Sequence, residues 1–244
     1  MKPSTWLCLW LLLIAAFWLG CEPASFPQPP AQERSQIRFF NALNAPPVNV
    51  QLRTYGETRF LTDRLMPRTS WPEGGYTSLL SRFNEFDTTA AVDIVQIDIE
   101  DYEGDTLLIE GYRENLPKGS FSTFFLVDSL GKPILTKIGD DFEKPRGARA
   151  TYRFINLYPF FSSMDVRSSN AADSLNFSFN TLEFLGYSGF QEVDAGRRTL
   201  TAYNTRSQTA VDSVSQVSLE AGGVYVFFVL SLNGFPVMDY ERIN

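Results

Sequence analysis

The sequence of 244 residues contains no histidine and only two cysteines, Cys8 and Cys21. Without histidine, the chain cannot form a Ser-His-Asp triad, a histidine general base or a histidine-ligated metal site. It also lacks a P-loop, a G-x-G-x-x-G motif after a strand pattern, and a C-x-x-C pair, so the common nucleotide and thiol-redox motifs are missing. Carboxylates remain as the main reactive groups, and we expect no cofactor.

Positive charge is scarce as well, with 21 Lys and Arg against 28 Asp and Glu, and a formal net charge of −7. A protein that binds the phosphate backbone presents a basic stripe, and none is visible here, so nucleic acid is a poor partner. Apolar residues make up 44% of the chain and aromatic residues 14%. This composition is typical of packed globular domains and not of disordered chains.

The N-terminus combines one charge, Lys2, with the apolar run Trp6–Leu19, and this run ends in Phe-Trp-Leu-Gly-Cys at Cys21. The ending resembles the lipobox of bacterial lipoproteins, which implies that residues 1–20 are a signal peptide and that Cys21 is acylated. The alternative is an uncleaved N-terminal anchor. Cys8 would leave with the leader, so the mature chain would have no disulfide. Because Glu22 and not Asp follows Cys21, we expect the outer membrane as destination, with the leaflet undetermined.

Residues 21–35 contain four prolines and predict an extended, semi-stiff tether between the lipid and the folded part.

The rest of the chain contains two similar copies of the same series of motifs. The stretch Leu116–Leu135 recurs as Leu219–Met238, at a constant offset of 103 residues, and an Arg-Phe-x-Asn motif begins at both Arg38 and Arg153. Each copy contains about seven short strand patterns and no helical apolar period. We therefore predict an all-β protein of two tandem immunoglobulin-like or transthyretin-like antiparallel β-sandwiches, at residues 36–139 and 149–244. An exposed linker, residues 140–148, joins them, and both arginines point outward from half-buried strands.

The order of these motifs resembles domain-of-unknown-function family 4397 (DUF4397). Each copy has an Arg-Phe-x-Asn start, a Val-Asn-Val or Met-Asp-Val strand, a central Gly-Tyr, and an L-x-x-G before the final aromatic strand. The resemblance implies small sandwiches of secreted proteins and lipoproteins, often in tandem. It implies no catalytic residues, because the shared motifs are structural.

A first candidate site is the carboxylate group Asp101, Glu103 and Asp105 around Gly104. Oxygen ligands in a loop suit Ca²⁺, although the spacing departs from the EF-hand pattern. The alternative is a solvated hairpin turn between two strands.

A second candidate is aromatic. The loop-rich insertion of the first copy contains four rings that could stack on sugars or grip another protein: Trp71, Tyr76, Phe83 and Phe86. The alternative is that these rings cap the open end of the sandwich.

A third pattern is Asp followed by Ser or Thr and then Leu, Val or Thr. It is similar to the O-glycosylation motif of some Gram-negative envelope proteins, and ordinary turn chemistry is the alternative. The candidate acceptors are Thr88, Thr106, Ser129, Ser174 and Ser213.

Together these patterns predict a lipid-anchored cell-envelope protein that acts as a non-catalytic binding or structural module. Its partners would be the membrane, through the lipid, and another envelope protein or a glycan. One alternative is a carbohydrate-binding accessory of a glycan-capture system. Another is a carboxylate-dependent hydrolase, which would need two acids in one cleft.

Overall fold

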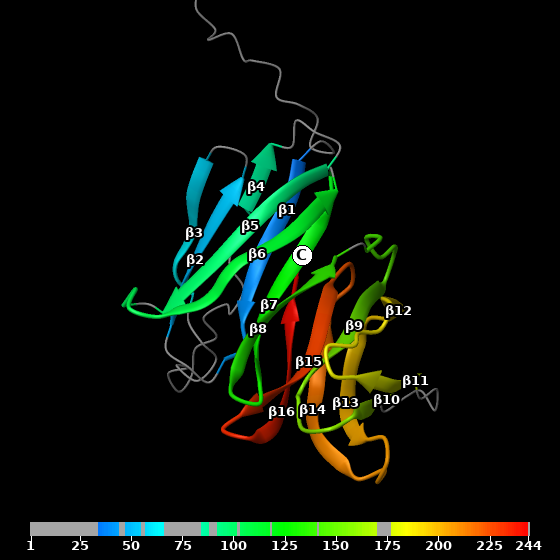
Figure 1. The fold of residues 1–244 in the computed structure, drawn as a ribbon. Coiled ribbons are helices and arrows are strands. Elements are labelled where there is room, and N and C mark those ends of the chain that lie inside the picture. The colour runs from blue at the N-terminus through cyan, green and yellow to red at the C-terminus, as the bar shows by residue number, and fades with distance from the viewer. Residues whose placement is uncertain are drawn as a thin grey trace, which may run out of the picture.

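The computed structural model describes residues 34–43, 47–54, 57–65, 84–87, 92–101, 103–117, 119–140, 142–169 and 177–243. These residues form sixteen strands and no helix (Figure 1), so the all-β prediction is confirmed. Within the part of the chain that is described, no helix is long and apolar enough to cross a membrane. The first strand begins at Arg34, two residues inside the stretch that the sequence assigns to the tether.

The first half of the chain folds into two four-stranded sheets, which pack face to face. One sheet has the order β4-β1-β7-β8, with β1 (Arg34–Asn41), β4 (Asn84–Asp87), β7 (Phe121–Ser129) and β8 (Lys132–Gly139). The other has the order β3-β2-β5-β6, with β2 (Val48–Thr54), β3 (Glu57–Leu65), β5 (Val92–Asp101) and β6 (Leu107–Pro117).

The second half repeats this topology strand for strand. One sheet has the order β12-β9-β15-β16, with β9 (Arg149–Leu157), β12 (Gln191–Asp194), β15 (Val224–Leu232) and β16 (Phe235–Arg242). The other has the order β11-β10-β13-β14, with β10 (Ser163–Ser169), β11 (Phe177–Glu183), β13 (Gly196–Asn204) and β14 (Ala210–Leu219). The stretch duplicated in the sequence therefore includes the same hairpin in each half, β7–β8 and β15–β16.

The sandwiches are not purely antiparallel. The first strand of each half runs parallel to the first strand of the duplicated hairpin, β1 beside β7 and β9 beside β15. The other strand pairs are antiparallel. A period-two pattern shows which face a side chain takes but not the direction of its neighbour, so this feature was not visible in the sequence.

Both halves also contain the same β-bulge between the two strands at one edge. In the first half the register of β5 and β6 shifts beside Asp98, whose Oδ1 accepts a hydrogen bond from the N–H of Gly111 at 2.6 Å. In the second half the shift between β13 and β14 occurs beside Thr199, whose hydroxyl faces the N–H of Gln216 at 3.4 Å. Gly111 and Gln216 share a left-handed backbone, with φ of 62° and 58°. A repeated irregularity of this kind supports the equivalence of the halves.

Each sandwich has its own apolar core. The core of the first sandwich lies between its two sheets and includes Phe39, Ile97 and Phe124. The core of the second includes Tyr152, Phe154 and Phe227.

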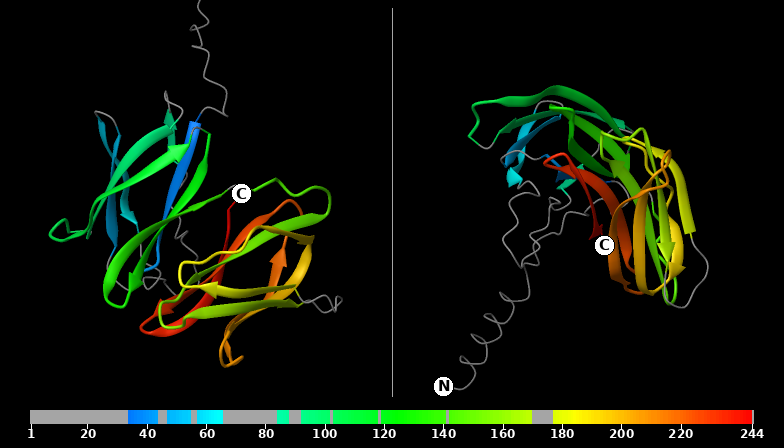
Figure 2. Two further views of the ribbon diagram at one scale, coloured as in Figure 1. Left: turned by 45° about the vertical axis from the view of Figure 1, so that its right-hand side comes forward. Right: turned by 90° about the horizontal axis from the view of Figure 1, so that it is seen from below.

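A third core lies between the sandwiches. The outer faces of the sheets that contain β1 and β9 meet there, and the ring of Phe40 lies edge-on to that of Phe228, with centroids 4.8 Å apart. Along β7 and β15, alternate side chains enter a sandwich core and this shared core. Both faces of these strands are therefore buried, which explains their unbroken apolar sequence. Figure 2 shows the two sandwiches lying side by side.

Candidate functional site

A buried ionic cluster lies beside the shared core. The Asp140 carboxylate accepts hydrogen bonds from Arg153 at 2.5 Å, from the Thr123 hydroxyl at 2.5 Å, and from Arg38 at 3.4 Å. Arg38 Nε also donates to the Thr123 hydroxyl at 2.7 Å, and Arg153 donates to the carbonyl oxygen of Gly139 at 2.6 Å. Asp140 is therefore bonded to both sandwiches.

The prediction that both arginines point out from half-buried strands is wrong. They do leave the core of their own sandwich, but the face that they enter is covered by the other sandwich, so Arg38 is 4% exposed and Arg153 2%. Burial lowers the pKa of both guanidinium groups, and the nearby Asp140 carboxylate opposes that effect. The linker is likewise not uniformly exposed, because Asp140 and Pro145 are buried.

Aromatic rings surround the Arg153 side of this cluster. The guanidinium carbon of Arg153 lies 4.6 Å from the centroid of Phe190 and 5.8 Å from that of Tyr187. Phe142 of the linker meets Phe190 edge-on, with centroids 5.5 Å apart. The ionic cluster thus holds two rings, from the linker and from the segment before β12, in fixed relation.

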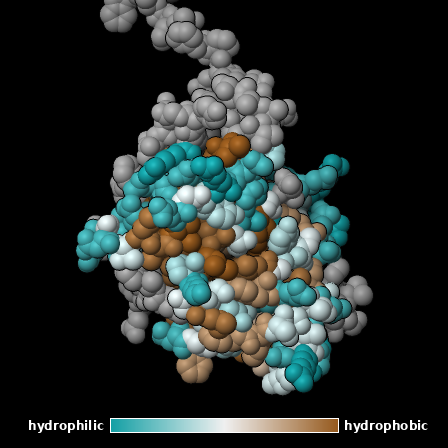
Figure 3. All heavy atoms as spheres, in the orientation of Figure 1, coloured by the Kyte–Doolittle hydropathy of each residue, from teal (hydrophilic) through white to brown (hydrophobic). Residues whose placement is uncertain are grey.

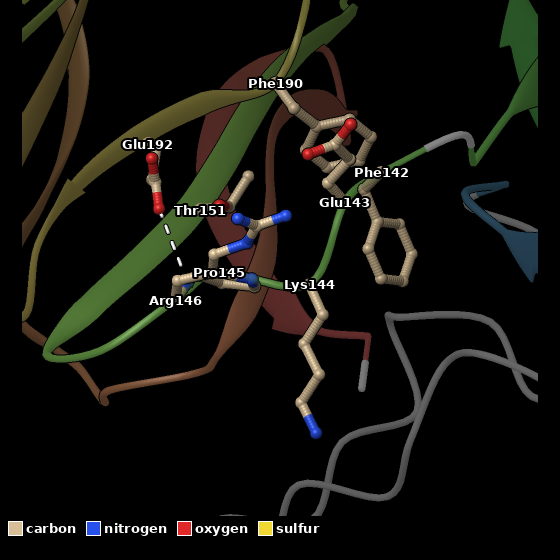
Figure 4. A pocket seen from close by; sticks show the side chains of 8 residues that line it. All are labelled: Phe142, Glu143, Lys144, Pro145, Arg146, Thr151, Phe190 and Glu192. Carbon is tan, nitrogen blue, oxygen red and sulfur yellow. Dashed lines mark hydrogen bonds between the residues drawn. The ribbon is translucent and has the colours of Figure 1, made fainter.

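These rings form one wall of a cleft of about 470 Å³ between the linker and the second sandwich (Figure 4). Its lining comprises Phe142, Glu143, Lys144, Pro145, Arg146, Thr151, Phe190 and Glu192. The linker is fixed at both ends of the cleft. Asp140 holds its start, while at its end Arg149 pairs with Glu192 at 2.9 Å and the N–H of Gly222 donates to the carbonyl oxygen of Arg149 at 2.7 Å. The cleft is therefore preformed.

The charged groups of the cleft differ in whether they already form an ion pair. Among the described residues, the Lys144 ammonium and the Arg146 guanidinium have no ion pair, while Glu192 pairs with Arg149. Figure 4 shows the Arg146 guanidinium turned back toward Thr151 and the Lys144 side chain extended away from it. The Arg146 guanidinium and the two rings therefore line the cleft together, and Lys144 adds a second unpaired cation that points away from them.

The cleft also holds two carboxylates, those of Glu143 and Glu192. Glycoside hydrolysis needs one acid kept protonated by a water-poor site. Both glutamates are exposed, and Glu192 accepts hydrogen bonds from Arg149 and from the N–H of Arg146. This arrangement suits ligand contact better than acid catalysis.

The carboxylates proposed for calcium lie in the turn between β5 and β6. Asp101 Oδ1 accepts a hydrogen bond from the N–H of Asp105 at 2.9 Å, and the N–H of Asp101 donates to the carbonyl oxygen of Thr106. Glu103 and Asp105 are exposed. No group of three potential metal-ligating residues occurs in the part of the chain that the structure describes. The Asp101 carboxylate thus closes a hairpin turn.

Other predicted residues are only partly covered. Cys21, Trp71, Tyr76, Phe83, Thr88 and Ser174 lie outside the described residues, and Phe86 is described only as a backbone position of β4, opposite Ser35. Thr106 and Ser213 are exposed, and Ser129 is half-buried at the end of β7. The aspartates before two of these residues cap backbone N–H groups, Asp128 that of Gly131 and Asp212 that of Met238.

The cleft could not be predicted from the sequence. Its one visible signal was an aromatic residue, Phe142, inside an otherwise charged linker, and nothing in the sequence placed Phe190 opposite it.

The chain resembles known proteins only remotely. No protein-family model matches the chain, and no curated protein shows significant sequence similarity to it. Among solved structures, it is similar to the C-terminal domain of AlgF from P. aeruginosa (15% identity, TM-score 0.30), covering 40% of this chain and all of that one. It is also similar to a family 26 carbohydrate-binding module of Amy13K from Eubacterium rectale (11%, TM-score 0.27), covering 84% of this chain and 96% of that one. A candidate cell adhesion protein from Bacteroides uniformis (8%, TM-score 0.27) covers 88% and 99%. At these TM-scores, the likenesses identify neither a family nor a ligand.

Proposed function

We propose that this protein is a non-catalytic binding module of the cell envelope, anchored by lipid on Cys21, and that its ligand occupies the cleft beside the linker. The observation that carries the proposal is the preformed cleft of about 470 Å³, whose linker wall is fixed at both ends by Asp140 and Arg149. A pocket of this size with aromatic walls and a few convergent polar groups is typical of ligand sites.

Binding is favoured over catalysis by the state of the cleft carboxylates. Both are exposed and one is ion-paired, so neither has the surroundings of a general acid. The unpaired cations of Lys144 and Arg146 can instead form ion pairs with a ligand. The two rings provide apolar contact area, and because they are already fixed, binding costs little conformational entropy.

A glycan array tests the cleft. The chain from residue 22, fluorescently labelled, is compared with the double variant Lys144→Glu/Arg146→Glu and with the control Arg113→Glu/Arg206→Glu, which reverses two exposed cations away from the cleft. We expect the cleft variant to lose retained glycans and the control to keep them. The same array tests the carbohydrate-accessory alternative, because binding through the aromatic insertion would be lost on Trp71→Ala. If neither the array nor chemical crosslinking in native envelopes yields a ligand sensitive to Lys144 and Arg146, the cleft is not the binding site.

The anchor is tested separately. Acylation predicts that Cys21→Ser or globomycin leaves the chain unprocessed and changes its membrane attachment. An intact mass that equals the polypeptide alone would refute it.

A further inference from the structure

Two of the most exposed apolar side chains in the described residues lie at equivalent turns. Leu130, in the β7–β8 turn, is 68% exposed, and Phe235, at the β15–β16 turn, is 73% exposed. Both hairpins have two consecutive turn residues with positive φ, Leu130 and Gly131 in one and Asn233 and Gly234 in the other. A third exposed ring, Phe160 in the β9–β10 turn, is 51% exposed. We name Leu130, Phe160 and Phe235 the apolar tip.

Stability does not explain Leu130. Its φ is 55°, a left-handed conformation that costs most L-residues about 1–2 kcal/mol and that hairpin turns normally give to Asn, Asp or Gly. The side chain is also mostly in water. A residue that is strained and apolar as well as exposed is a candidate for a binding role.

The rings of the tip are held rigidly. The hydroxyl of the buried Tyr158 donates to the carbonyl oxygen of Gly234 at 2.9 Å, which ties the β9–β10 turn to the β15–β16 turn. The ring of Tyr158 also packs against that of Phe160, with centroids 5.2 Å apart. Phe160 and Phe235 are thus presented at fixed positions, so little conformational entropy is lost when they are covered.

Both sandwiches contribute to the same end of the molecule. Arg38 and Arg153, at equivalent positions of β1 and β9, meet at Asp140. Two residues further along β1, Phe40 meets Phe228 of β15, which lies beside Ile155, two residues further along β9. The strands of the two facing sheets therefore run in the same sense, and the turns that follow β7 and β15 lie at one end. Figure 1 and the left view of Figure 2 show these two turns side by side.

The chemistry of the tip is that of a hydrocarbon surface. No residue of the segments 157–164 and 230–238 is charged, and the β7–β8 hairpin contributes the exposed cation Lys132 and the half-buried Asp128, whose carboxylate accepts the N–H of Gly131. The tip is continuous with the shared core, since Leu230, Leu232 and Ile134 belong to or pack against that core. The exposed polar residues of the β9–β10 and β15–β16 turns are Ser162 and Asn233, and three apolar side chains are far fewer than a stable protein interface uses. A fluid bilayer adapts to a projecting apolar tip, and a cation at its rim suits lipid phosphates.

The tether is long enough for this contact. Because Gln36 lies level with Phe121 and β1 is parallel to β7, Arg34 and the tip are at opposite ends, separated by roughly 35 Å at about 3.3 Å per residue. The 13 residues from Cys21 to Arg34 span about 40 Å when extended. A chain anchored at Cys21 can therefore place its far end on the same bilayer.

We propose that the apolar tip inserts into the bilayer that holds the lipid anchor, so that the two sandwiches stand on the membrane by Leu130, Phe160 and Phe235. This proposal uses the anchor of the proposed function but not the cleft. In the tethered chain, insertion is intramolecular, and a weak contact suffices because the effective concentration of lipid is high.

The test replaces the natural anchor, so that it does not depend on acylation. The chain from Cys21 to Asn244 is coupled through the Cys21 thiol to a maleimide phospholipid in phosphatidylcholine vesicles, with or without brominated acyl chains. Phe235→Trp in a Trp71→Phe background is the reporter, and Ile94→Trp in the same background is the control, because Ile94 is 57% exposed on the first sandwich and outside the tip. We expect brominated lipid to quench the tryptophan at 235 and not the one at 94.

Two further variants complete the test. Leu130→Ser/Phe160→Ser should reduce quenching at 235, and in flotation of the uncoupled chain Phe235→Ser should weaken partitioning by about tenfold or more, as expected for one Phe removed from hydrocarbon. Ile94→Ser should leave partitioning unchanged. Absence of quenching at 235 overturns the proposal. If the chain then sediments as a dimer that Phe235→Ser dissociates, the tip binds a second copy. If it remains monomeric, the tip does not bind lipid or itself.

Discussion

Asp140 and Ile243 occupy the same position in the two sandwiches. Each directly follows the last strand of its half, and each donates its backbone N–H to the chain at the start of the duplicated hairpin, to the carbonyl oxygen of Phe121 and of Val224, at 2.8 Å in both cases. Only Asp140 carries a charge, and the equivalent arginines, Arg38 and Arg153, both pair with it. The two halves thus share one backbone plan, and a single carboxylate fixes how they join.

Removal of that carboxylate should strongly destabilise the protein. Asp140→Ala leaves two buried guanidinium groups without their shared partner, and breaking a buried ion pair in this way typically costs about 3–5 kcal/mol. We expect a large fall in the urea midpoint. The matched control is Arg149→Ala, which removes the exposed pair with Glu192 and should cost no more than about 1 kcal/mol. Equal effects of the two substitutions would show that the ionic cluster does not stabilise the junction.

The shared core should couple the two sandwiches energetically. Phe40→Ala and Phe228→Ala should each cost about 3–5 kcal/mol, and a double-mutant cycle should give a coupling of about 0.5–1.5 kcal/mol because their rings touch. Their neighbours Phe39 and Phe227 lie in separate cores, so Phe39→Ala and Phe227→Ala form the control cycle and should be additive. We expect the wild-type chain to unfold in one transition. Two separate transitions in denaturant would contradict a cooperative junction.

A cluster at the open edge of the first sandwich should give an alkaline transition. Burial raises the pKa of Tyr112 to about 12, and the hydrogen-bonded Glu114 carboxylate adds to this effect. Because the folded pKa lies above the unfolded one, near 10, this contribution to stability is complete below pH 10. It is lost as the pH rises through about 12. Burial also raises the pKa of Tyr152 and of Tyr158, so absorbance at 295 nm should show several phenols that titrate late, and Tyr112→Phe should reduce that late phase by one phenol. An unchanged late phase in the variant would show that Tyr112 is not among them.

The apolar surface near this cluster is visible in Figure 3, where brown side chains gather over the region of β6 to β8. Leu107, at the start of β6, is exposed, and the partly buried Leu108 and Ile109 pack against the first core. A bridge from Lys137 of β8 to Glu114 of β6, at 2.8 Å, spans this edge. The Lys137 contact also holds the pKa of Glu114 down, although burial of the carboxyl acts in the opposite direction.

The sequence predicted strands better than it predicted surfaces. The run Val224–Leu230 was correctly interpreted as a buried strand, because length and aromatic content identify such runs. The sequence of this run could not show that Phe227 and Phe228 enter different cores. Arg38 and Arg153 were assigned the correct side of their strands, but whether that side is exposed to solvent depends on the other sandwich. The cleft was hidden for a related reason, since Phe142 and Phe190 are 48 positions apart in the chain and meet only where the linker packs against the second sandwich.

Gly186 should be sensitive to the smallest substitution. It lies in the segment between β11 and β12, where its N–H donates to the carbonyl oxygen of Glu183 at 2.7 Å and its own carbonyl oxygen accepts from the N–H of Asn156. A Cβ at Gly186 would lie 2.8 Å from the Glu183 oxygen and 3.0 Å from the Glu183 nitrogen. Both contacts are with backbone, so Gly186→Ala must displace the segment, at a cost of about 1–3 kcal/mol.

This displacement should also reach the cleft, because the same segment holds Tyr187 and Phe190 against Arg153. We expect Gly186→Ala to lower both the unfolding midpoint and the binding of any ligand that depends on Lys144 and Arg146. Gly189→Ala is the matched control, since a Cβ there meets nothing within 4 Å and the change in stability should stay within about 0.5 kcal/mol. If both alanine variants behave alike in thermal melts and in ligand titrations, the close approach at Gly186 does not position the wall of the cleft. If Gly186→Ala loses stability but still binds the ligand, the position of Phe190 is set by its contacts with Arg153 and Phe142. The turn at Gly186 is then not needed to position that ring.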